Sequence, residues 1–132
     1  MSRHARAFTL LELIIVIMVL GILATMALPF YIRAAEKART TEAKVSLATI
    51  RSAQIRYHAS HDGTGYATDL SQLDVELGSK YFILSAGLGT EANCGNATRN
   101  SSAEWKGGAP YTLTIDIDGT LSIDPVEYEY LL

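Results

Sequence analysis

Few residues in this sequence have the type and the spacing that chemistry requires, and Glu12 is the most unusual of them. It stands near the start of an almost wholly apolar stretch, residues 8–30. A carboxylate at the middle of a bilayer costs about 2.5 to 3.5 kcal/mol on insertion scales, so an acid in such a stretch indicates a function. A basic leader with Arg3, His4 and Arg6 precedes the stretch. The acid and the leader have to be explained together.

Two other groups of residues could bind a metal ion. His58 and His61 are three residues apart at the end of an expected helix, and the alternative is that they interact with the helix dipole. Asp116, Asp118 and Asp124 lie along an expected hairpin and are weak candidates for calcium, which needs more oxygen ligands than these. Asp118 is typical of the hairpin turn, and Asp116 is expected on the exposed face of its strand. Neither residue therefore needs a metal ion to account for its presence. We therefore predict neither a metal nor another cofactor.

The remaining motifs give little support for an enzyme. The sequence has no phosphate loop, no GxSxG and no cysteine–histidine pair with an orienting group. Cys94 is the only cysteine, so neither an intrachain disulfide nor a cysteine metal site can form. The formal net charge of −3 comes without a dense basic cluster outside the leader, and no nucleic-acid partner is indicated. Asn96 and Asn100 each begin a match to the N-glycosylation pattern. Such short patterns often occur by chance, so we predict no glycosylation from them.

The element that must position Glu12 follows from the apolar stretch. As a helix, residues 8–30 would be about 34 Å long, enough to cross a bilayer core of about 30 Å. The cations of the leader place it in the cytoplasm and the rest of the chain outside. A secretory signal peptide and a plain membrane anchor are the alternatives, but each leaves the acid without a role.

The run Ala7-Phe8-Thr9-Leu10-Leu11-Glu12-Leu13, followed by an apolar helix with Gly21 and Pro29, resembles the class III signal of type IV pilins and pseudopilins. The resemblance implies that a prepilin peptidase cuts between Ala7 and Phe8 and methylates the new amine of Phe8. It also implies that Glu12 pairs with this amine in a neighbouring subunit, and that the helix unwinds between Gly21 and Pro29 in the filament. The family usually has Gly before the cut, where this chain has Ala7.

The same resemblance implies a structural subunit of a type IV pilus or related filament, and no enzyme. Its partners would be further copies in a helical filament, the prepilin peptidase, an inner-membrane assembly platform and a cytoplasmic ATPase. The chain would cross the inner membrane once before assembly and lie in an extracellular or periplasmic filament afterwards. The alternatives are a pseudopilin of a type II secretion system and a monomeric single-pass membrane-anchored binding domain.

The expected fold is α+β, with a leader at 1–7, an apolar helix segment at 8–30 and a head at 31–132. One helix should run from near Phe8 to about Ser60, because residues 31–60 contain neither Gly nor Pro. Its head part has two stripes, of which the first can pack on the head and the second on neighbouring subunits. The alternative is a single broad buried face. The stripes are Ala43, Leu47, Ile50, Gln54 and Tyr57, and Val45, Ala48, Ser52, Ile55 and Ala59. A charged collar should be mostly solvated: Arg33, Glu36, Lys37, Arg39, Glu42 and Lys44.

The rest of the head should form a small antiparallel sheet. Glycines in 61–65 predict the end of the helix, and a short helix at 68–73 and a strand at 80–85 follow. Residues 86–110 have a loop composition, with either an irregular strand or a functional surface, and Trp105 could anchor them. A hairpin pairs 111–117 with 120–124 around Asp118-Gly119. Its helix-facing residues are Tyr111, Leu113, Ile115, Ile117, Leu121 and Ile123. The tail 128–132 should pack or pair at the sheet edge, held by turn chemistry and the aspartates.

Overall fold

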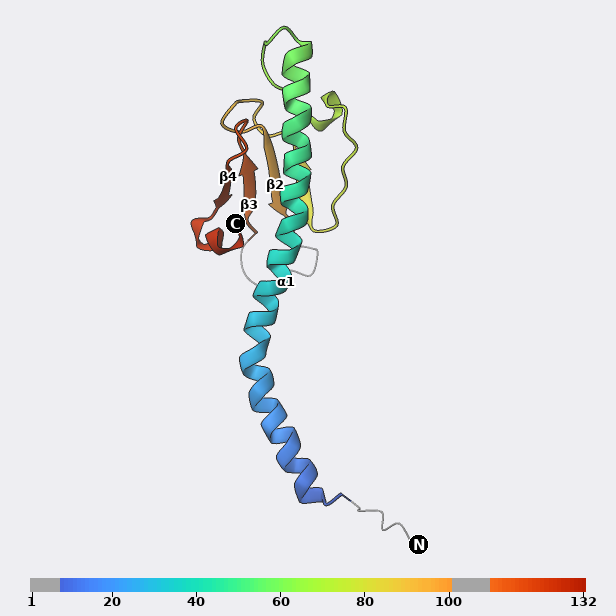
Figure 1. Ribbon diagram of the computed structural model, residues 1–132, viewed down its shortest axis with the longest axis vertical. Coiled ribbons are helices and arrows are strands. Elements are labelled where there is room, and N and C mark those ends of the chain that lie inside the picture. Colours follow the sequence, from blue (N-terminus) through green and yellow to red (C-terminus); the bar gives the residue numbers. More distant parts are fainter. Residues whose placement is uncertain (1–7, 101–109) are drawn as a thin grey trace. The chain divides into compact units, whose positions relative to one another are not determined.

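The first element is a helix, α1, which runs from Leu10 to Ser60 in the computed structural model (Figure 1). Thr9 caps its start, since the backbone N–H of Glu12 donates to the Thr9 hydroxyl at 3.2 Å. The helix ends where Asp62 and Gly63 adopt the left-handed conformation, with φ of 55° and 72°. Both the single long helix and its end at these residues confirm the prediction from composition.

The structure describes residues 8–100 and 110–132, and the chain divides into two compact units. The N-terminal unit ends at Ala35 and the head begins at Glu36, so the division falls within α1. The backbone is helical through both Gly21 and Pro29. Unwinding between these two residues was inferred for the filament, and it stays a prediction.

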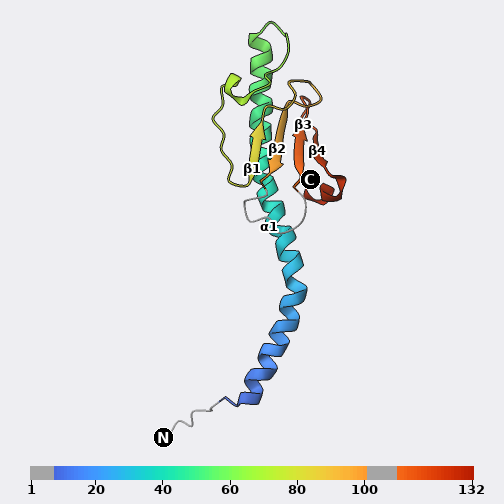
Figure 2. The ribbon, with the colours of Figure 1, turned by 180° about the vertical axis from the view of Figure 1, so that it is seen from behind.

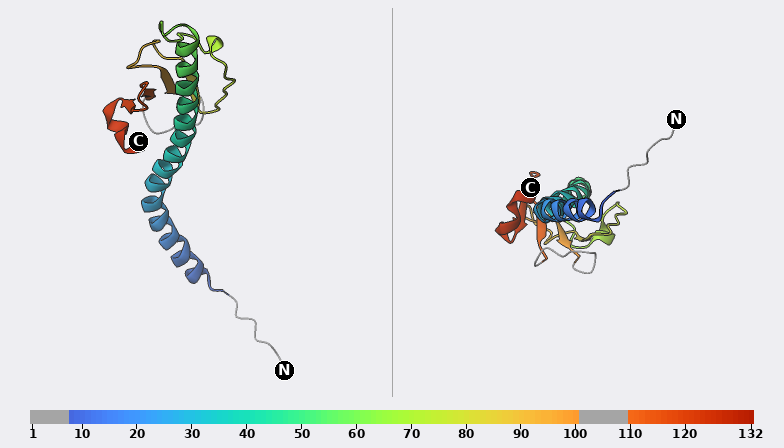
Figure 3. Two further views of the ribbon diagram at one scale, coloured as in Figure 1. Left: turned by 45° about the horizontal axis from the view of Figure 1, so that its top comes forward. Right: turned by 90° about the horizontal axis from the view of Figure 1, so that it is seen from below.

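The head contains a four-stranded antiparallel sheet in which each strand pairs with the next along the chain (Figure 2). The strands are β1 (Phe82–Ser85), β2 (Gly95–Arg99), β3 (Thr112–Ile115) and β4 (Leu121–Asp124). In different views they lie on one side of the head part of α1 (Figure 1, Figure 3). This arrangement confirms the α+β fold of a long helix packed on a small antiparallel sheet.

Strand β2 lies within the segment whose composition indicates a loop, and it is an inner strand of the sheet. Of the two alternatives for residues 86–110, the strand is therefore present. Its inward positions carry small residues at Gly95 and Ala97, because the strand passes close to α1. A Cβ atom on Gly95 would lie 3.0 Å from a methyl of Ile50 and 3.2 Å from one of Ile115. The close packing that requires small residues also removes the apolar alternation by which a strand is recognised.

The hairpin formed by β3 and β4 confirms the prediction, with Leu113 opposite Ile123. Its turn contains Gly119 at a φ of 96°, and the Asp116 carboxylate accepts a hydrogen bond of 2.7 Å from the Thr120 N–H. Four of the six predicted helix-facing residues are buried, and the other two are partly buried. The buried ones are Tyr111, Leu113, Ile115 and Ile123, and the partly buried ones are Ile117 and Leu121.

The two stripes of α1 in the head have different surroundings. The first stripe packs on the sheet, with Ala43, Leu47, Ile50 and Gln54 completely buried. Every residue of the second stripe is exposed. The alternative of one broad buried face is therefore wrong.

Two short 3₁₀ helices flank the sheet in sequence. The first, η1, covers Leu70–Gln72 and is shorter than the predicted helix at 68–73. Asp69 caps it, as its carboxylate accepts from the Ser71 N–H at 2.8 Å. The bidentate ion pair of Arg56 with Asp74 joins the segment that follows η1 to α1.

The second 3₁₀ helix, η2, covers Val126–Leu131 and packs beside β4 (Figure 3). Tyr128 and Leu131 are buried, and the Tyr128 ring lies 5.0 Å from that of Tyr111. Lys44 of α1 donates from Nζ to the carbonyl oxygens of Leu131 and Leu132, at 3.0 and 2.6 Å. Apolar packing and one lysine thus hold the tail, in addition to the turn chemistry that the sequence predicts.

Candidate functional site

The helix of the N-terminal unit has apolar side chains on all sides. Every large apolar side chain from Phe8 to Ile32 is more than two-fifths exposed. The helix is long and apolar enough to cross a membrane, by length and composition only, with a mean hydropathy of 2.7 over an 18-residue window. So much exposed apolar surface requires lipid or protein around it.

Glu12 lies in the first turn of α1, on the capped end of this apolar helix. Thr9 and Glu12 have the Thr-x-x-Glu spacing of a capping box, and the Thr9 half of it is formed. Thr9 is a residue that the sequence reasoning did not single out, although this spacing could have revealed it. Within residues 8–100 and 110–132, no cation forms an ion pair with the Glu12 carboxylate. The acid thus stands in the first turn of the helix, where the helix dipole favours a negative charge.

The other predicted residues of the N-terminal unit are Ala7, Phe8, Gly21 and Pro29. Ala7, on the leader side of the predicted cleavage, lies outside the described residues. Phe8 is 77% exposed and immediately precedes the Thr9 cap. A Cβ atom on Gly21 would meet no heavy atom within 4 Å. Pro29 has no N–H to donate to the Thr25 carbonyl. The helix therefore lacks one backbone hydrogen bond, the one between Thr25 and Pro29.

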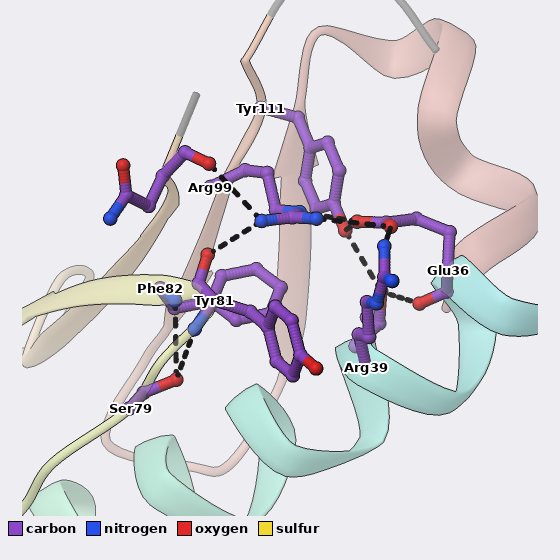
Figure 4. Close-up of polar contacts among 9 residues, drawn as sticks. Glu36, Arg39, Ser79, Tyr81, Phe82, Arg99 and Tyr111 are labelled. Atoms are coloured by element: carbon purple, nitrogen blue, oxygen red, sulfur yellow. Dashed lines mark hydrogen bonds and ion pairs between the residues drawn. The ribbon is translucent and has the colours of Figure 1, made fainter. Parts of the chain in front are cut away.

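A second polar cluster, in the head, joins α1 to the sheet (Figure 4). Glu36 on α1 and Arg99 at the end of β2 are each 1% exposed. They form a bidentate pair, with 2.5 Å between Oε1 and Nε and 3.3 Å between Oε2 and Nη2. The Tyr111 hydroxyl donates to Glu36 Oε1 at 2.8 Å, and Arg39 donates to Oε2 at 3.2 Å. The carboxylate is therefore fully engaged with donors.

The same cluster engages all three guanidinium nitrogens of Arg99. Its Nη1 donates to the carbonyl oxygens of Tyr81 and Asn100, at 2.9 and 3.1 Å. Burial raises the pKa of the Tyr111 hydroxyl above its ordinary range, so this group stays protonated and can donate to Glu36. The arrangement clamps the helix to the sheet. The prediction that the whole charged collar is mostly solvated is wrong for Glu36, because Arg99 of β2 and Tyr111, just before β3, lie against it.

The candidate metal ligands have other roles in the structure. His58 Nδ1 lies 2.9 Å from the Gly65 carbonyl oxygen, and His61 Nδ1 lies 2.9 Å from that of Tyr57. Each ring also stacks on a tyrosine, His58 on Tyr66 and His61 on Tyr57. Both histidines therefore belong to the end of α1.

The three aspartates of the hairpin are not brought together. Asp116 and Asp118 belong to the turn end of the hairpin, whereas Asp124 pairs with Thr112 at its other end. Among residues 8–100 and 110–132, no group of three metal-binding side chains is present.

The remaining residues singled out in the sequence lie in or near β2. Cys94 is buried, and its Sγ donates to the Ile115 carbonyl at 3.4 Å. Asn96 is partly buried on the inner strand β2. The pattern that begins at Asn100 extends into residues outside the description, and Trp105 also lies outside it.

Comparison with known proteins gives two matches. Residues 2–28 match the model of the prokaryotic N-terminal methylation motif. Over 86 residues, the chain is 34% identical to the type IV major pilin protein PilA of Myxococcus xanthus. That match covers 64% of this chain and 39% of the relative, so the chain spans about two fifths of the relative's length. Both matches agree with the resemblance that the first residues show.

Proposed function

We propose that this chain is a member of the type IV pilin family and a structural subunit of a type IV pilus or a related filament. The observation that carries the proposal is the apolar helix of the N-terminal unit. This helix is exposed on all sides, is capped by Thr9 and has Glu12 in its first turn. A filament core and a bilayer are the two environments that can cover such a helix. Family members of this kind serve as structural proteins, and the proposed role needs no catalysis.

Processing would precede assembly. A prepilin peptidase would cut between Ala7 and Phe8 on the cytoplasmic side and methylate the Phe8 nitrogen, after which that nitrogen is a cation in apolar surroundings. Glu12 of a neighbouring subunit would then neutralise it, because each charge alone is costly in a medium of low dielectric constant. The Thr9 cap supports this role, since it holds Glu12 at the end of the helix nearest the new amine.

The proposed partners and location follow from the same scheme. The chain would cross the inner membrane once before assembly and join an extracellular or periplasmic filament of identical subunits. Lipid tails are as apolar as the side chains of the helix, so leaving the bilayer yields little hydrophobic stabilisation. An assembly platform with a cytoplasmic ATPase would therefore supply the work, and helix packing together with the Glu12 pair would supply the specificity.

The substitution Glu12→Ala tests the proposal. We expect membrane insertion to be unchanged and filaments, counted by electron microscopy, to be abolished or sharply reduced. Glu76→Ala is the matched control, because Glu76 is an exposed acid of the head. Filaments at the normal level from Glu12→Ala would contradict the pairing. A persistent monomer of the unmodified chain after detergent removal would contradict the filament and favour a monomeric membrane-anchored domain.

A further inference from the structure

Strand β4 forms one edge of the sheet, and its backbone is open on the side away from β3 (Figure 2). In an antiparallel pair, every second residue directs its N–H and C=O groups toward the partner strand, and the others direct them away. The Asp116 N–H donates to the Thr120 carbonyl at 3.1 Å, which sets this alternation for the hairpin. The N–H and C=O groups of Leu121 and Ile123 therefore point away from β3. Within the part of the chain that the structure describes, no group forms a hydrogen bond with them.

The opposite edge of the sheet, β1, is better protected. The N–H of Phe82 donates to the Ser79 hydroxyl at 3.1 Å. The Ala86 carbonyl, just after the strand, accepts a hydrogen bond of 3.0 Å from Gln54. Native sheets protect their edges because open backbone groups are a template for a further strand. The edge of β4 is thus the one that can accept such a strand.

A groove lies along this open edge, between β4 and η2. It has a volume of about 220 Å³, and four of its six lining residues are apolar: Leu121, Ile123, Val126 and Leu132, with Ser122 and Glu129. Val126 is 70% exposed and Leu132 39% exposed. Because Lys44 of α1 donates to the carbonyl oxygens at the end of η2, this end lies on the α1 side of the sheet. The side chains of Leu121 and Ile123 point to the same side.

The surroundings of the groove are acidic. Asp124, at the end of β4, and Glu127 and Glu129, on η2, are all exposed. In the described residues, none of these three carboxylates forms an ion pair. The nearby cation, Lys44, donates to backbone carbonyls and does not neutralise them. Charge complementarity therefore favours a partner that carries a cation beside its apolar side chains.

We propose that the groove binds an extended peptide, which adds a further strand antiparallel to β4. Such a peptide exchanges both backbone hydrogen bonds with Leu121 and with Ile123. Its side chains opposite these two residues are apolar and enter the groove, since facing residues of two strands share one face of the sheet. The residue opposite Asp124 is Lys or Arg, because facing opposite charges stabilise strand pairing. The peptide Lys-Val-Thr-Val-Thr has this pattern, with its lysine opposite Asp124.

Binding of this peptide tests the proposal. Fluorescence anisotropy of the fluorescein-labelled peptide, titrated with the full chain in detergent, should show saturable binding. N-methylation of both valines removes the N–H groups that donate to Leu121 and Ile123, and it should lower the affinity at least about tenfold. N-methylation of the central threonine is the matched control, because its N–H points away from β4. Equal affinities of the three peptides would overturn strand addition.

A charge in the wall of the groove gives an independent measurement. Val126→Asp should lower the affinity for the peptide at least about tenfold, since an apolar contact is replaced by a charge. The melting temperature should not change, because Val126 is 70% exposed. Ile83→Asp is the matched control, as Ile83 is 61% exposed on β1. Equal losses of affinity from the two variants would overturn the groove as the binding site.

An exchange of charges tests the cation of the peptide. The unmodified chain should bind Lys-Val-Thr-Val-Thr more tightly than Glu-Val-Thr-Val-Thr. Asp124→Lys should reverse this preference, because the facing charges are then opposite only for the second peptide. The same preference in both chains would overturn the pairing with Asp124.

Amide hydrogen exchange, followed by NMR, locates the added strand. When nine tenths of the chains hold the peptide, exchange at Leu121 and Ile123 should be about tenfold slower than without it. The amide of Leu84, on β1, should not change. Slower exchange at Leu84 alone would place the peptide on β1 and overturn the proposal.

The outcomes are independent of the filament. Peptide binding by a chain that forms no filaments would support the groove and contradict only the proposed function. A second copy is the competing occupant of the edge. Dimers of the unmodified chain that Val126→Asp abolishes, together with no binding of the peptide, would identify that occupant and overturn the peptide proposal.

Discussion

Glu36 on α1 and Arg99 on β2 form a bidentate ion pair with 2.5 Å between Oε1 and Nε, although each residue is only 1% exposed. The desolvation of two buried charges offsets much of their attraction, so the pair adds little over an apolar contact of the same shape. Its main effect is on specificity. An arginine and an acid that are both buried must meet, and this fixes how the sheet sits on the helix.

Removal of one partner should therefore be costly. We expect Glu36→Ala to lower the free energy of unfolding by about 3 to 5 kcal/mol, because Arg99 would remain buried without its counter-charge. Urea unfolding of the full chain in detergent, followed by the near-ultraviolet circular dichroism of the tyrosines, measures the change. Glu42→Ala is the control, since Glu42 is exposed and accepts one bond, from Ser79. Similar losses from the two variants would contradict the clamp.

Tyr111 makes the stability of the head depend on alkaline pH. Burial raises the pKa of its hydroxyl above the ordinary value of about 10. Above that pH the unfolded chain loses the proton while the folded chain keeps it, so the free energy of unfolding falls by about 1.4 kcal/mol per pH unit. Below it, this group contributes no pH dependence. Tyr111→Phe lacks the group, and the stability advantage of the unmodified chain should shrink by about 1 kcal/mol between pH 10 and 11, where the unfolded tyrosine goes from half to almost fully ionised. A constant difference across that range would contradict the assignment.

Gln54 is a buried amide that joins α1 to three loop segments. Its Nε2 donates to the carbonyls of Ala67, Ala86 and Cys94, at 2.8, 3.0 and 3.1 Å, and its Oε1 accepts from the Ala67 N–H at 2.8 Å. Gln54→Leu should cost about 3 kcal/mol, because these backbone groups would stay buried without partners. The midpoint of urea unfolding measures this loss of stability. Ser52→Ala, at an exposed position, is the control and should change stability by less than about 0.5 kcal/mol. An unchanged midpoint for Gln54→Leu would show that water reaches these groups.

Ala7 should limit the rate of processing without preventing it. Alanine is the smallest side chain after glycine, so we expect Ala7→Gly to raise the processed fraction and Ala7→Leu to abolish cleavage. Mass spectrometry of the N-terminus of membrane-bound chains measures both the cut and the methylation of Phe8. Ser2→Leu, also in the leader, should leave processing unchanged. Equal processing of the unmodified chain and of Ala7→Leu would show that the peptidase does not read this position.

Local signals determined a large part of this protein. The length and composition of residues 8–30, the acid at Glu12, the end of α1 near Gly63 and the turn at Gly119 can each be recognised from a few neighbouring residues. Hydrophobic patterns, backbone conformation and turn chemistry are encoded over such short ranges, so the α+β fold and the proposed filament role follow from the sequence. Even the Thr9 cap is a local signal, which its spacing to Glu12 makes visible.

Only the tertiary structure decided the features that depend on contact between distant segments. β2 has small residues at Gly95 and Ala97 because α1 passes close to it, and no local pattern reveals a strand whose side chains are limited by a distant helix. Glu36 stands among charged neighbours in the sequence, yet a strand 63 residues away makes it a buried acid. Whether a charge is solvated or buried depends on what packs against it, and that is settled by the fold as a whole.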